Sequence, residues 1–367
     1  PYRRDYVIKL DGSGPWDFRV RRITKDRDDE KIQDQVFWTS YAELTWTDTN
    51  YPDTAVMGVI FDAKQFNSTP ELAIRARGII CKIPHNYTPS TRSYSGAFNG
   101  TLTTGYTNNP AWVLYDLLTN TRYGMGLPED NIDIYSFYSA SVYNDEIISD
   151  GNNGSGPRFT FNGYLERRGS AYEILKAVLG SFNAQLYLEN GSVTLVQDKP
   201  KDPIYIFNDS NVVIEEDDNG NLTKPPFTYE TTAQNTRYNS ILVSWDDPNE
   251  FYETKTLIVQ EPTDIAAYGY NPTEITVFGC TNKAEAIRRG RWLLYTSLFQ
   301  TRTVGFTVGK DGLYVSPGDI IRIQDSTRTN QRLGGRIKTS TSTQFTLDSA
   351  VEFDSSKTYT VQWLDQN

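Results

Sequence analysis

The chain has 367 residues, which at about 100 to 200 residues per domain allows two to four domains and excludes a single small module. Its 36 Lys and Arg against 46 Asp and Glu give a net charge of −10, and so acidic a chain lacks the electrostatic surface of proteins that bind nucleic acid or anionic membranes. The one histidine, His85, excludes metal sites and catalytic mechanisms that need two imidazoles from this chain.

Residues 6–92 have the pattern of a strand-rich region. Short runs, from YVIKL at the start to ELAIRARGIICKI near the end, are rich in β-branched and aromatic residues and are separated by Asp-Gly, Tyr-Pro and Thr-Pro breaks. Several short strands in succession are typical of a small sandwich or barrel. We therefore predict an inserted β-rich domain, OB-like or a sandwich, over residues 1–92.

The pattern changes to mixed α and β over residues 93–205, which we predict to be an α+β domain. Asn109 followed by Pro110 is a capping residue with proline at the first helical position, and it predicts a helix that stops near Gly124. One face of this helix carries large apolar residues that we expect in the core: Trp112, Tyr115 and Leu118.

A second helix is predicted to begin at Ser170, with Glu173 completing a capping box in which each side chain bonds the other's free backbone donor. After it come two alternating runs, AQLYLE and SVTLVQ, on either side of Asn190 and Gly191. Both of these residues readily adopt positive φ, so the pattern predicts a tight β-hairpin.

From residue 206 onward strands return with one helix among them. YNSILVSWDDP and TKTLIV are strand patterns, and Asn282 with Glu285 predicts a second capping box at the start of a helix over residues 283–298. We divide this part into a barrel-like domain with one helix, 206–313, and the start of a further small β domain, 314–367. The helix carries a cluster of three arginines, our candidate interface residues: Arg288, Arg289 and Arg291.

The sequence carries none of the common catalytic or ligand motifs: GxGxxG, GxxxxGK[ST] and GxSxG do not occur. The segment EEDDNGNL (215–222) comes closest to a calcium loop, but its twelfth position is Pro226, where a bidentate Glu is needed, so we interpret it as a turn. Cys81 and Cys280 stand 199 positions apart, outside any CxxC, and we expect both to be free and buried. We accordingly predict no catalytic residue, no cofactor and no metal.

The overall fold class predicted is α+β, mainly β, with several small sandwich or barrel domains and three helices packed on them. The excess of aromatic residues, 24 Tyr, 17 Phe and 7 Trp, fits core packing, interface contacts or a carbohydrate platform. A carbohydrate-binding or adhesin module therefore stays open as an alternative function, and a glycan hydrolase that uses two of the many carboxyls is a weaker one.

Several segments resemble the tip attachment protein J family of lambda-like siphophage tails, in the same order along almost the whole chain. The longest is SYSGAFNGTLTTGYTNNPAWVLYDLLTNTRYGMGLP (93–128), preceded by IPHNYTPSTRSYSG (83–96). NSILVSWDDP with the helix NKAEAIRRGRWLLY (282–295), and GLYVSPGDIIRIQD to FTLD (312–348), follow. FWTSYAEL (37–44) is similar to the N-terminal insertion of the family.

The resemblance implies a structural, non-enzymatic protein of a phage or prophage tail tip, with domains of the tail hub type. Such proteins form a homotrimeric hub at the distal end of the tail tube, in the virion tail tip, after assembly in the host cytoplasm. Expected partners are the other copies, further tail tip and tail tube proteins, the tape measure protein and DNA that passes through without specific binding. We read the chain as a piece of a longer protein, whose C-terminal region, outside this chain, would contact the host receptor. Part of the negative charge is then expected to line a central channel, because a basic wall would hold DNA phosphates.

Overall fold

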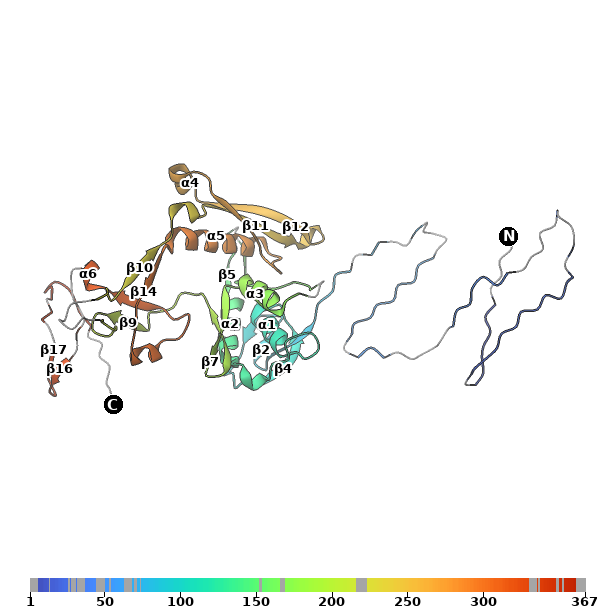
Figure 1. The fold of residues 1–367 in the computed structure, drawn as a ribbon, viewed down its shortest axis with the longest axis horizontal. Coiled ribbons are helices and arrows are strands. Elements are labelled where there is room, and N and C mark those ends of the chain that lie inside the picture. Colours follow the sequence, from blue (N-terminus) through green and yellow to red (C-terminus); the bar gives the residue numbers. More distant parts are fainter. Residues whose placement is uncertain are drawn as a thin grey trace. The chain divides into compact units, whose positions relative to one another are not determined.

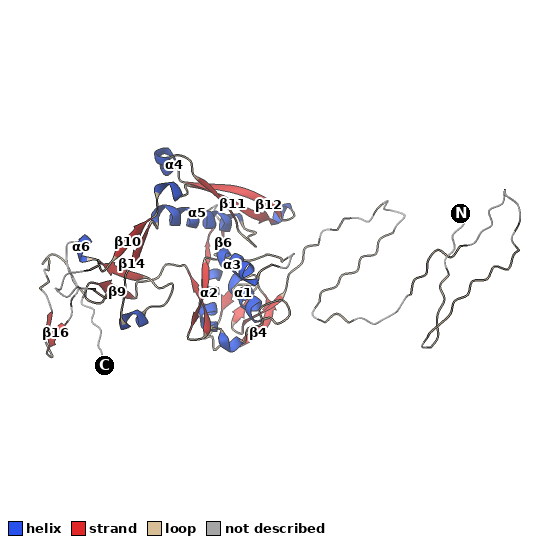
Figure 2. Ribbon diagram, in the orientation of Figure 1, coloured by secondary structure: helices blue, strands red, loops and turns tan. Residues whose placement is uncertain are grey.

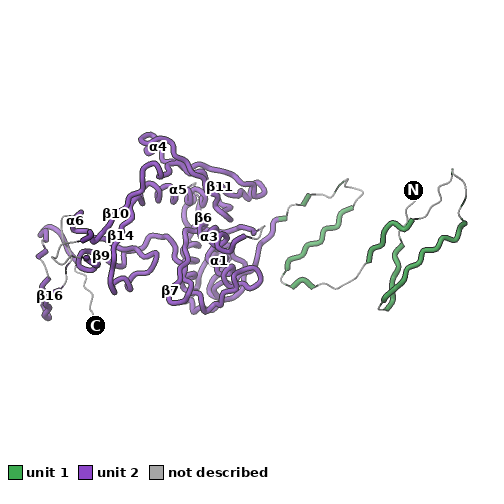
Figure 3. The backbone as a smooth tube through the Cα atoms, in the orientation of Figure 1, with its two compact units in different colours: residues 1–74 green, residues 75–367 purple. Residues whose placement is uncertain are grey.

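The computed structural model describes the chain outside residues 1–5, 13, 26, 28–30, 32–36, 44–49, 53, 63–67, 69–70, 73, 152–153, 166–168, 216–222, 330–334, 336, 348–349, 352 and 361–367. The chain divides into two compact units, Pro1–Ile74 and Arg75–Asn367 (Figure 3). The helices and strands of the second unit give an α+β fold, mainly β, in which small sheets are combined with helices (Figure 2). The segment 216–222, which holds most of the calcium-like loop, lies outside the described residues.

The first unit contains no helix or strand among its described residues. Apolar side chains there are exposed, for example Val7 at 88% and Ile60 at 100%. Alternating apolar residues form stable strands when a second layer buries one face, and the described residues provide no such layer. The strands predicted between residues 6 and 79 are therefore not formed in the described residues, and strand pairing begins at Ile80. The β-rich domain over 1–92 stays a prediction.

The second unit begins with a layer of short strands and helices around one core. In chain order its elements are β1 (Ile80–Pro84), β2 (Tyr87–Thr88), β3 (Ser93–Tyr94), β4 (Leu102–Tyr106), α1 (Pro110–Thr119), the 3₁₀ turn η1 (Glu129–Asn131), α2 (Ile134–Asp145), β5 (Ile147–Ser149), β6 (Ser155–Pro157), α3 (Ala171–Ser181), β7 (Ala184–Glu189) and β8 (Ser192–Gln197). β1 pairs with β4, β2 with β3, β5 with β6 and β7 with β8, all antiparallel.

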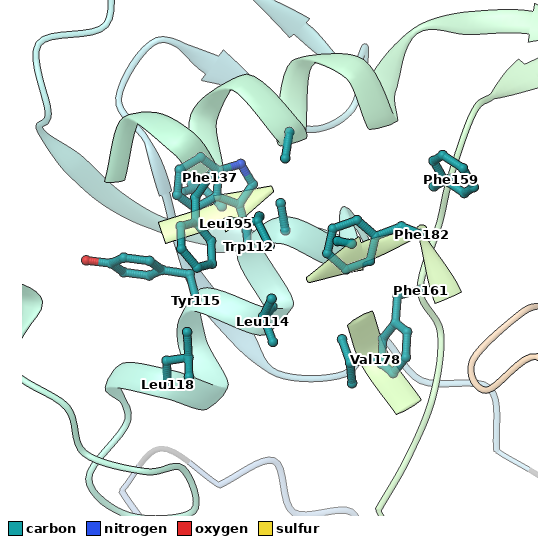
Figure 4. Packing of buried hydrophobic residues seen from close by; sticks show 14 of the residues in the cluster. Trp112, Leu114, Tyr115, Leu118, Phe137, Phe159, Phe161, Val178, Phe182 and Leu195 are labelled. Carbon is teal, nitrogen blue, oxygen red and sulfur yellow. The ribbon is translucent and has the colours of Figure 1, made fainter. Parts of the chain in front are cut away.

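The core of this region, which we call the first core, is centred on the predicted face of α1 (Figure 4). Trp112, Tyr115 and Leu118 are each no more than 1% exposed, as the sequence pattern predicts. Asn109 caps the helix by accepting a hydrogen bond from the backbone N–H of Ala111. The helix ends at Thr119 rather than near Gly124. Beyond it the chain turns back, and the backbone N–H groups of Met125 and Leu127 bond the carbonyls of Leu117 and Leu118 in the last helical turn.

Helix α2 is not predicted from the sequence. Its segment IYSFYSASVYND mixes aromatic and polar residues without a clear apolar stripe, so the helical period is weak. The signal that could have indicated it is Asp133, whose side chain accepts a hydrogen bond from the backbone N–H of Tyr135. Phe137, fully buried, anchors the helix in the first core.

The second predicted helix and the hairpin are present with one correction. Helix α3 follows Ser170, but the Ser170 side chain makes no capping hydrogen bond, so the capping box with Glu173 is wrong. The hairpin of β7 and β8 turns at Asn190 and Gly191, which have φ of +50° and +85°, the backbone conformation that the sequence predicts.

The second core lies between one helix and a three-stranded sheet. The elements are β11 (Ser240–Asp247), the 3₁₀ turn η3 (Pro248–Glu250), β12 (Glu253–Gln260), α4 (Pro262–Tyr268), β13 (Pro272–Thr276) and α5 (Lys283–Phe299). β11 is central, antiparallel to β12 and parallel to β13. α5, predicted over 283–298, packs along β11 and β12 (Figure 1). Gly290 of α5 allows this close approach, because an added Cβ would lie 2.7 Å from a Val243 methyl carbon.

The third core is built from segments far apart in the sequence. Its strands are β9 (Tyr205–Asn208), β10 (Thr228–Thr231), β14 (Arg302–Gly305) and β15 (Ile321–Gln324). In the chain, the 3₁₀ turn η2 (Gln234–Thr236) follows β10 and the 3₁₀ turn η4 (Lys310–Tyr314) follows β14. β9 pairs with β15 in parallel and β10 pairs with β14 antiparallel. The third core contains residues on both sides of two predicted domain boundaries, the one between residues 205 and 206 and the one between residues 313 and 314. A short helix α6 (Ser326–Thr329) and the antiparallel pair β16 (Ile337–Ser340) and β17 (Phe345–Leu347) follow.

Candidate functional site

The first and second cores are joined by residues 157–162, which we call the strap. Phe159 and Phe161 of the strap are buried in the first core. Asn162, at its other end, donates its backbone N–H to the carbonyl of Gly279 at 2.8 Å and its side-chain amide to the Thr281 hydroxyl at 2.9 Å. The ring of Phe161 meets Phe278 edge-on, with ring centroids 5.2 Å apart. The strap is thus fastened to the loop that precedes α5.

Glu285, in the first turn of α5, holds the middle of the strap. Its side chain is 1% exposed and accepts two hydrogen bonds from Thr160, one from the backbone N–H at 3.1 Å and one from the hydroxyl at 2.9 Å. Burial raises the pKa of this carboxyl to about 7, although the two Thr160 bonds and the charges of Arg288 and Arg92 act in the opposite direction.

This arrangement overturns the predicted capping box of α5. Asn282 is the N-cap, as predicted, and its side chain accepts from the backbone N–H of Ala284. Glu285, however, bonds the strap and not the cap. Sequence reasoning missed this role because the partner, Thr160, stands 125 positions earlier in the chain.

The three arginines predicted as interface residues lie in different surroundings. Arg288 donates to the backbone carbonyls of Pro157 and Arg158, at 3.3 and 2.8 Å, and so serves the strap. Arg289 stacks over the ring of Trp292, 4.3 Å from its centroid, and burial lowers its pKa to about 10. Arg291 is exposed.

Arg291 begins an exposed stripe on α5 that continues at helical spacing with Tyr295 and Phe299. These two aromatic residues are 46% and 73% exposed, and their ring centroids lie 5.7 Å apart. Arginine and aromatic side chains are the types enriched at the centres of protein interfaces. We call these three residues the α5 stripe.

A buried polar network supports the first core behind the strap. Asp145, the last residue of α2, is 4% exposed and forms an ion pair with Arg92 at 2.6 Å. The same carboxylate accepts hydrogen bonds from the Tyr94 hydroxyl and the Asn109 side-chain amide, both at 2.8 Å. All three partners lie within or beside the segment SYSGAF…TNNP that carries the family resemblance.

Two hollows among the described residues have the size of a small binding site. The larger, about 880 Å³, is lined by Phe299, Gln300, Thr301, Arg302, Asp319 and Ile321. The smaller, about 200 Å³, is lined by residues of α2, β7 and β8, by Lys199 and Lys201 after β8, and by Pro317 and Asp319 of the loop before β15. In both of these hollows Asp319 is the one acidic lining residue, so neither presents the pair of carboxyls that glycoside hydrolysis needs.

Both cysteines are free and buried, and burial raises the pKa of each thiol to about 12. Within the described residues, no three or more His, Cys, Asp or Glu side chains gather in a way that could hold a metal ion. In that same part of the chain, no helix is both long enough and apolar enough to cross a membrane.

Comparison with known proteins gives two family matches. A family described as "Putative phage tail protein" matches residues 170–338, which include the second and third cores. The family "Tip attachment protein J, FNIII-A domain" matches residues 1–47, in the first unit.

Two curated relatives match over most of the chain, and both are named Tip attachment protein J. The protein of Escherichia phage SECphi27 is 37% identical over 325 residues, which is 87% of this chain and 26% of that protein. The protein of Escherichia phage SECphi4 is 30% identical over 360 residues, 96% of this chain and 31% of that protein. The chain thus spans between about a quarter and a third of the length of these relatives.

Two solved structures align with part of the chain. A chain of the virion of a native gene transfer agent particle aligns with a TM-score of 0.35 and 12% identity, over 43% of this chain and 34% of that chain. The 43 kDa tail protein of prophage MuSo2 from Shewanella oneidensis aligns with a TM-score of 0.27 and 13% identity, over 45% of this chain and 46% of that one.

Proposed function

From its homology to tip attachment proteins J, which covers most of the chain, we infer that this protein is a structural component of a phage tail tip that takes part in attachment. The observation that carries this proposal is the match to two such proteins at 37% and 30% identity over 87% and 96% of the chain. The two family matches, to a phage tail protein and to a tip attachment protein J domain, support the same role.

A homotrimeric hub around the path of the DNA is the arrangement that we propose for it, assembled in the host cytoplasm and then located in the virion tail tip. Other tail tip and tail tube proteins and the tape measure protein would dock on this ring, while the receptor is contacted by a region outside this chain. A closed ring needs large interfaces between rigid domains and no chemistry of its own. The net charge of −10 suits a channel wall that does not retain DNA.

Of the three arginines, Arg291 is the one that we propose for the contact between copies. It is exposed and is followed by the aromatic residues Tyr295 and Phe299 of the α5 stripe. In the proposed contact its guanidinium would pair with one of the carboxylates of the neighbouring copy, which carries 46 Asp and Glu. Arg288 already binds the strap and Arg289 stacks on Trp292, so their contribution would be to hold α5 in place.

The mass of the chain in solution, measured by light scattering over a range of concentrations, tests the ring. A trimer of about three times 41.7 kDa is expected. Arg291→Glu should lower the trimer fraction by about tenfold or more, because a carboxylate in place of the guanidinium would repel the carboxylate with which Arg291 is proposed to pair. Arg122→Glu, at an exposed arginine of the turn after α1, should leave the trimer intact. A wild-type chain that stays monomeric at the highest concentration would refute this interface.

Location in the tail tip requires a separate test, because a trimer could serve other roles. Gold-labelled antibodies against the purified chain should mark the distal end of the tail in electron micrographs of virions that carry this protein. Label spread along the tail or on the head would contradict the proposed role.

The exposed pair Tyr295 and Phe299 is the observation that favours a second candidate, a carbohydrate-binding module. An aromatic pair of this kind can stack on a sugar ring as well as on a protein partner. Binding to a glycan array that is lost in Tyr295→Ala, from a chain that is monomeric, would favour this candidate over the ring.

A further inference from the structure

We propose that the tip of the β11–β12 hairpin, which carries Phe251 and Tyr252, docks into the larger hollow of a neighbouring copy of the chain, beside the α5 stripe. The inference rests on the proposed function, because it concerns the contact between copies. It names the surface that meets the stripe.

The hairpin tip holds two aromatic residues in a backbone conformation that large side chains seldom adopt. Phe251 and Tyr252 have φ of +52° and +63°. In this left-handed region the Cβ crowds the following carbonyl oxygen, so two such residues in succession cost free energy in the folded chain. The β7–β8 turn has similar angles but uses Asn190 and Gly191, which adopt them at a lower cost. The turn alone therefore does not explain the aromatic pair.

The tip is held in shape while both of its rings face solvent. The Asp247 carbonyl accepts from the backbone N–H of Tyr252 at 2.8 Å, and the Asp247 carboxylate accepts from the N–H of Asn249 at 3.0 Å. Lys255 forms an ion pair with the same carboxylate at 3.2 Å. Phe251 is nevertheless 87% exposed and Tyr252 44%. Strained positions with exposed aromatic side chains are typical of sites that contact a partner.

The hollow lies at the opposite end of α5 from the tip (Figure 1). Just before β11, the N–H of Tyr238 donates to the Ser297 hydroxyl near the end of α5, at 2.8 Å. Near the end of β11, the N–H of Asp246 donates to the Cys280 carbonyl in the loop ahead of α5, at 3.0 Å. A helix of 17 residues is about 25 Å long. The tip therefore cannot reach the hollow of its own copy, and only the tip of another copy can fill it.

The hollow has the size and the chemistry to receive this tip. Its volume of about 880 Å³ exceeds that of two aromatic side chains, and Phe299, which is 73% exposed, and Ile321 supply apolar lining. Arg302, also in the lining, is exposed and has no ion-pair partner among the described residues. An apolar surface beside an unpaired guanidinium suits an aromatic residue with a carboxylate next to it.

The tip carries such a carboxylate. Glu253 directly follows the aromatic pair, is exposed and is likewise without an ion pair in the part of the chain that the structure describes. In the docked arrangement it meets Arg302 while the two rings cover Phe299. Asp319, the acidic residue of the lining, is already bonded within its own loop, where it accepts the backbone N–H of Ser316 at 2.8 Å.

A tip at one end and a hollow at the other make a head-to-tail contact, in which each copy inserts one tip and receives one. Contacts of this kind close into a ring when the rotation between copies is a whole fraction of a turn. A two-fold dimer would instead bring the same surface of both copies together. The docking thus provides the type of contact that the proposed trimer requires.

Cross-linking between two co-expressed full-length variants tests the docking. One carries Phe251→Cys at the tip and the other Gln300→Cys in the lining of the hollow, while the native cysteines are buried. A short bismaleimide should join the two into a product of twice 41.7 kDa. Neither variant alone should give this product, because a tip meets a hollow and not a second tip. Tyr172→Cys in place of Phe251→Cys is the matched control, since Tyr172 is also an exposed aromatic residue, at 72%, and should give none.

Light scattering on the same samples separates this inference from the proposed function. A trimer that gives no cross-link refutes the docking, leaves the proposed function intact and assigns the tip to a different tail protein. A chain that stays monomeric at the highest concentration refutes both.

The variant with Phe251→Asn and Tyr252→Gly gives the tip the residues of the β7–β8 turn. It removes the backbone cost and the aromatic contacts together. When both chains are dilute and monomeric, it should unfold at a higher temperature than the wild-type chain. Its trimer fraction should nevertheless fall by about tenfold or more, because the tip has lost its anchors. An unchanged trimer fraction overturns the proposal, whatever the effect on unfolding.

Discussion

Two neighbouring carboxylates, Asp145 and Glu146, should differ several-fold in their effect on stability when each is replaced by alanine. Asp145 is 4% exposed and bonds Arg92, Tyr94 and Asn109 at 2.6 to 2.8 Å. Glu146 forms a single ion pair with Arg158 at 2.6 Å, and its side chain is 49% exposed. The pair of substitutions compares a buried network with a surface ion pair at adjacent positions.

The magnitude follows from what each substitution leaves behind. Asp145→Ala removes the only carboxylate among the described residues that pairs with the guanidinium of Arg92, whose side chain is 16% exposed and which keeps a hydrogen bond to Asn108. The Tyr94 hydroxyl and the Asn109 amide each lose one acceptor and keep a second on Ser141. Breaking a buried pair in this way costs about 3 to 5 kcal/mol. Glu146→Ala releases Arg158 to water at one edge, and exposed pairs contribute roughly 0 to 1 kcal/mol.

Urea unfolding followed by circular dichroism measures both changes, with the slope m compared between variants to check that the same surface is exposed. The double variant with Arg92→Ala provides a coupling energy, because removing both members of the buried pair should cost less than the sum of the single costs. Equal costs for Asp145→Ala and Glu146→Ala, or additive costs for Arg92 and Asp145, would refute the argument from burial.

Two further predictions come from the helices and the cysteines. Gly290→Ala should destabilise the chain by about 1 kcal/mol, because the added Cβ would lie 2.7 and 2.9 Å from two valine methyl carbons, and this overpacking outweighs the gain of roughly 1 kcal/mol in helix propensity. Gly180→Ala in α3 should instead stabilise the chain, because no atom lies within 4 Å of the added Cβ. Thermal unfolding of the two variants measures both changes. The thiols of Cys81 and Cys280, buried with pKa values raised to about 12, should react with a thiol reagent at pH 8 at least 10²-fold more slowly in the folded chain than in urea, and rapid labelling of the folded chain would contradict this.

Local signals in the sequence predicted local structure well. The turn at Asn190 and Gly191 is specified by two residues that accept positive φ, and the structure places both there. The same holds for the start of α1 at Asn109 and for the burial of Trp112 on its inner face. In each case the partners of the interaction lie within a few positions in the chain, so one segment contains the whole signal.

Pairings between distant segments were not predictable in the same way. The third core joins β9 to β15 across more than a hundred positions, and no periodicity within either strand indicates its partner. Both strands have only four residues, too few for an alternation pattern to be distinctive. The candidate site at the strap was missed for this reason, since α5 was predicted correctly but the segment it holds was not.

Glu285 shows how a distant partner overrides a local one. At the third position of a helix, a glutamate can reach back to the cap and bond one free amide, which is the interaction that the sequence predicts. The strap offers it two donors from Thr160, but only in a site where the carboxyl is 1% exposed and its pKa rises to about 7. A helix alone would gain nothing from this burial, so the residue serves the joint between the cores and not α5 itself. Changes to the strap should therefore alter hydrogen exchange in both the first and the second core, whereas changes to the Asn282 cap should be confined to the second.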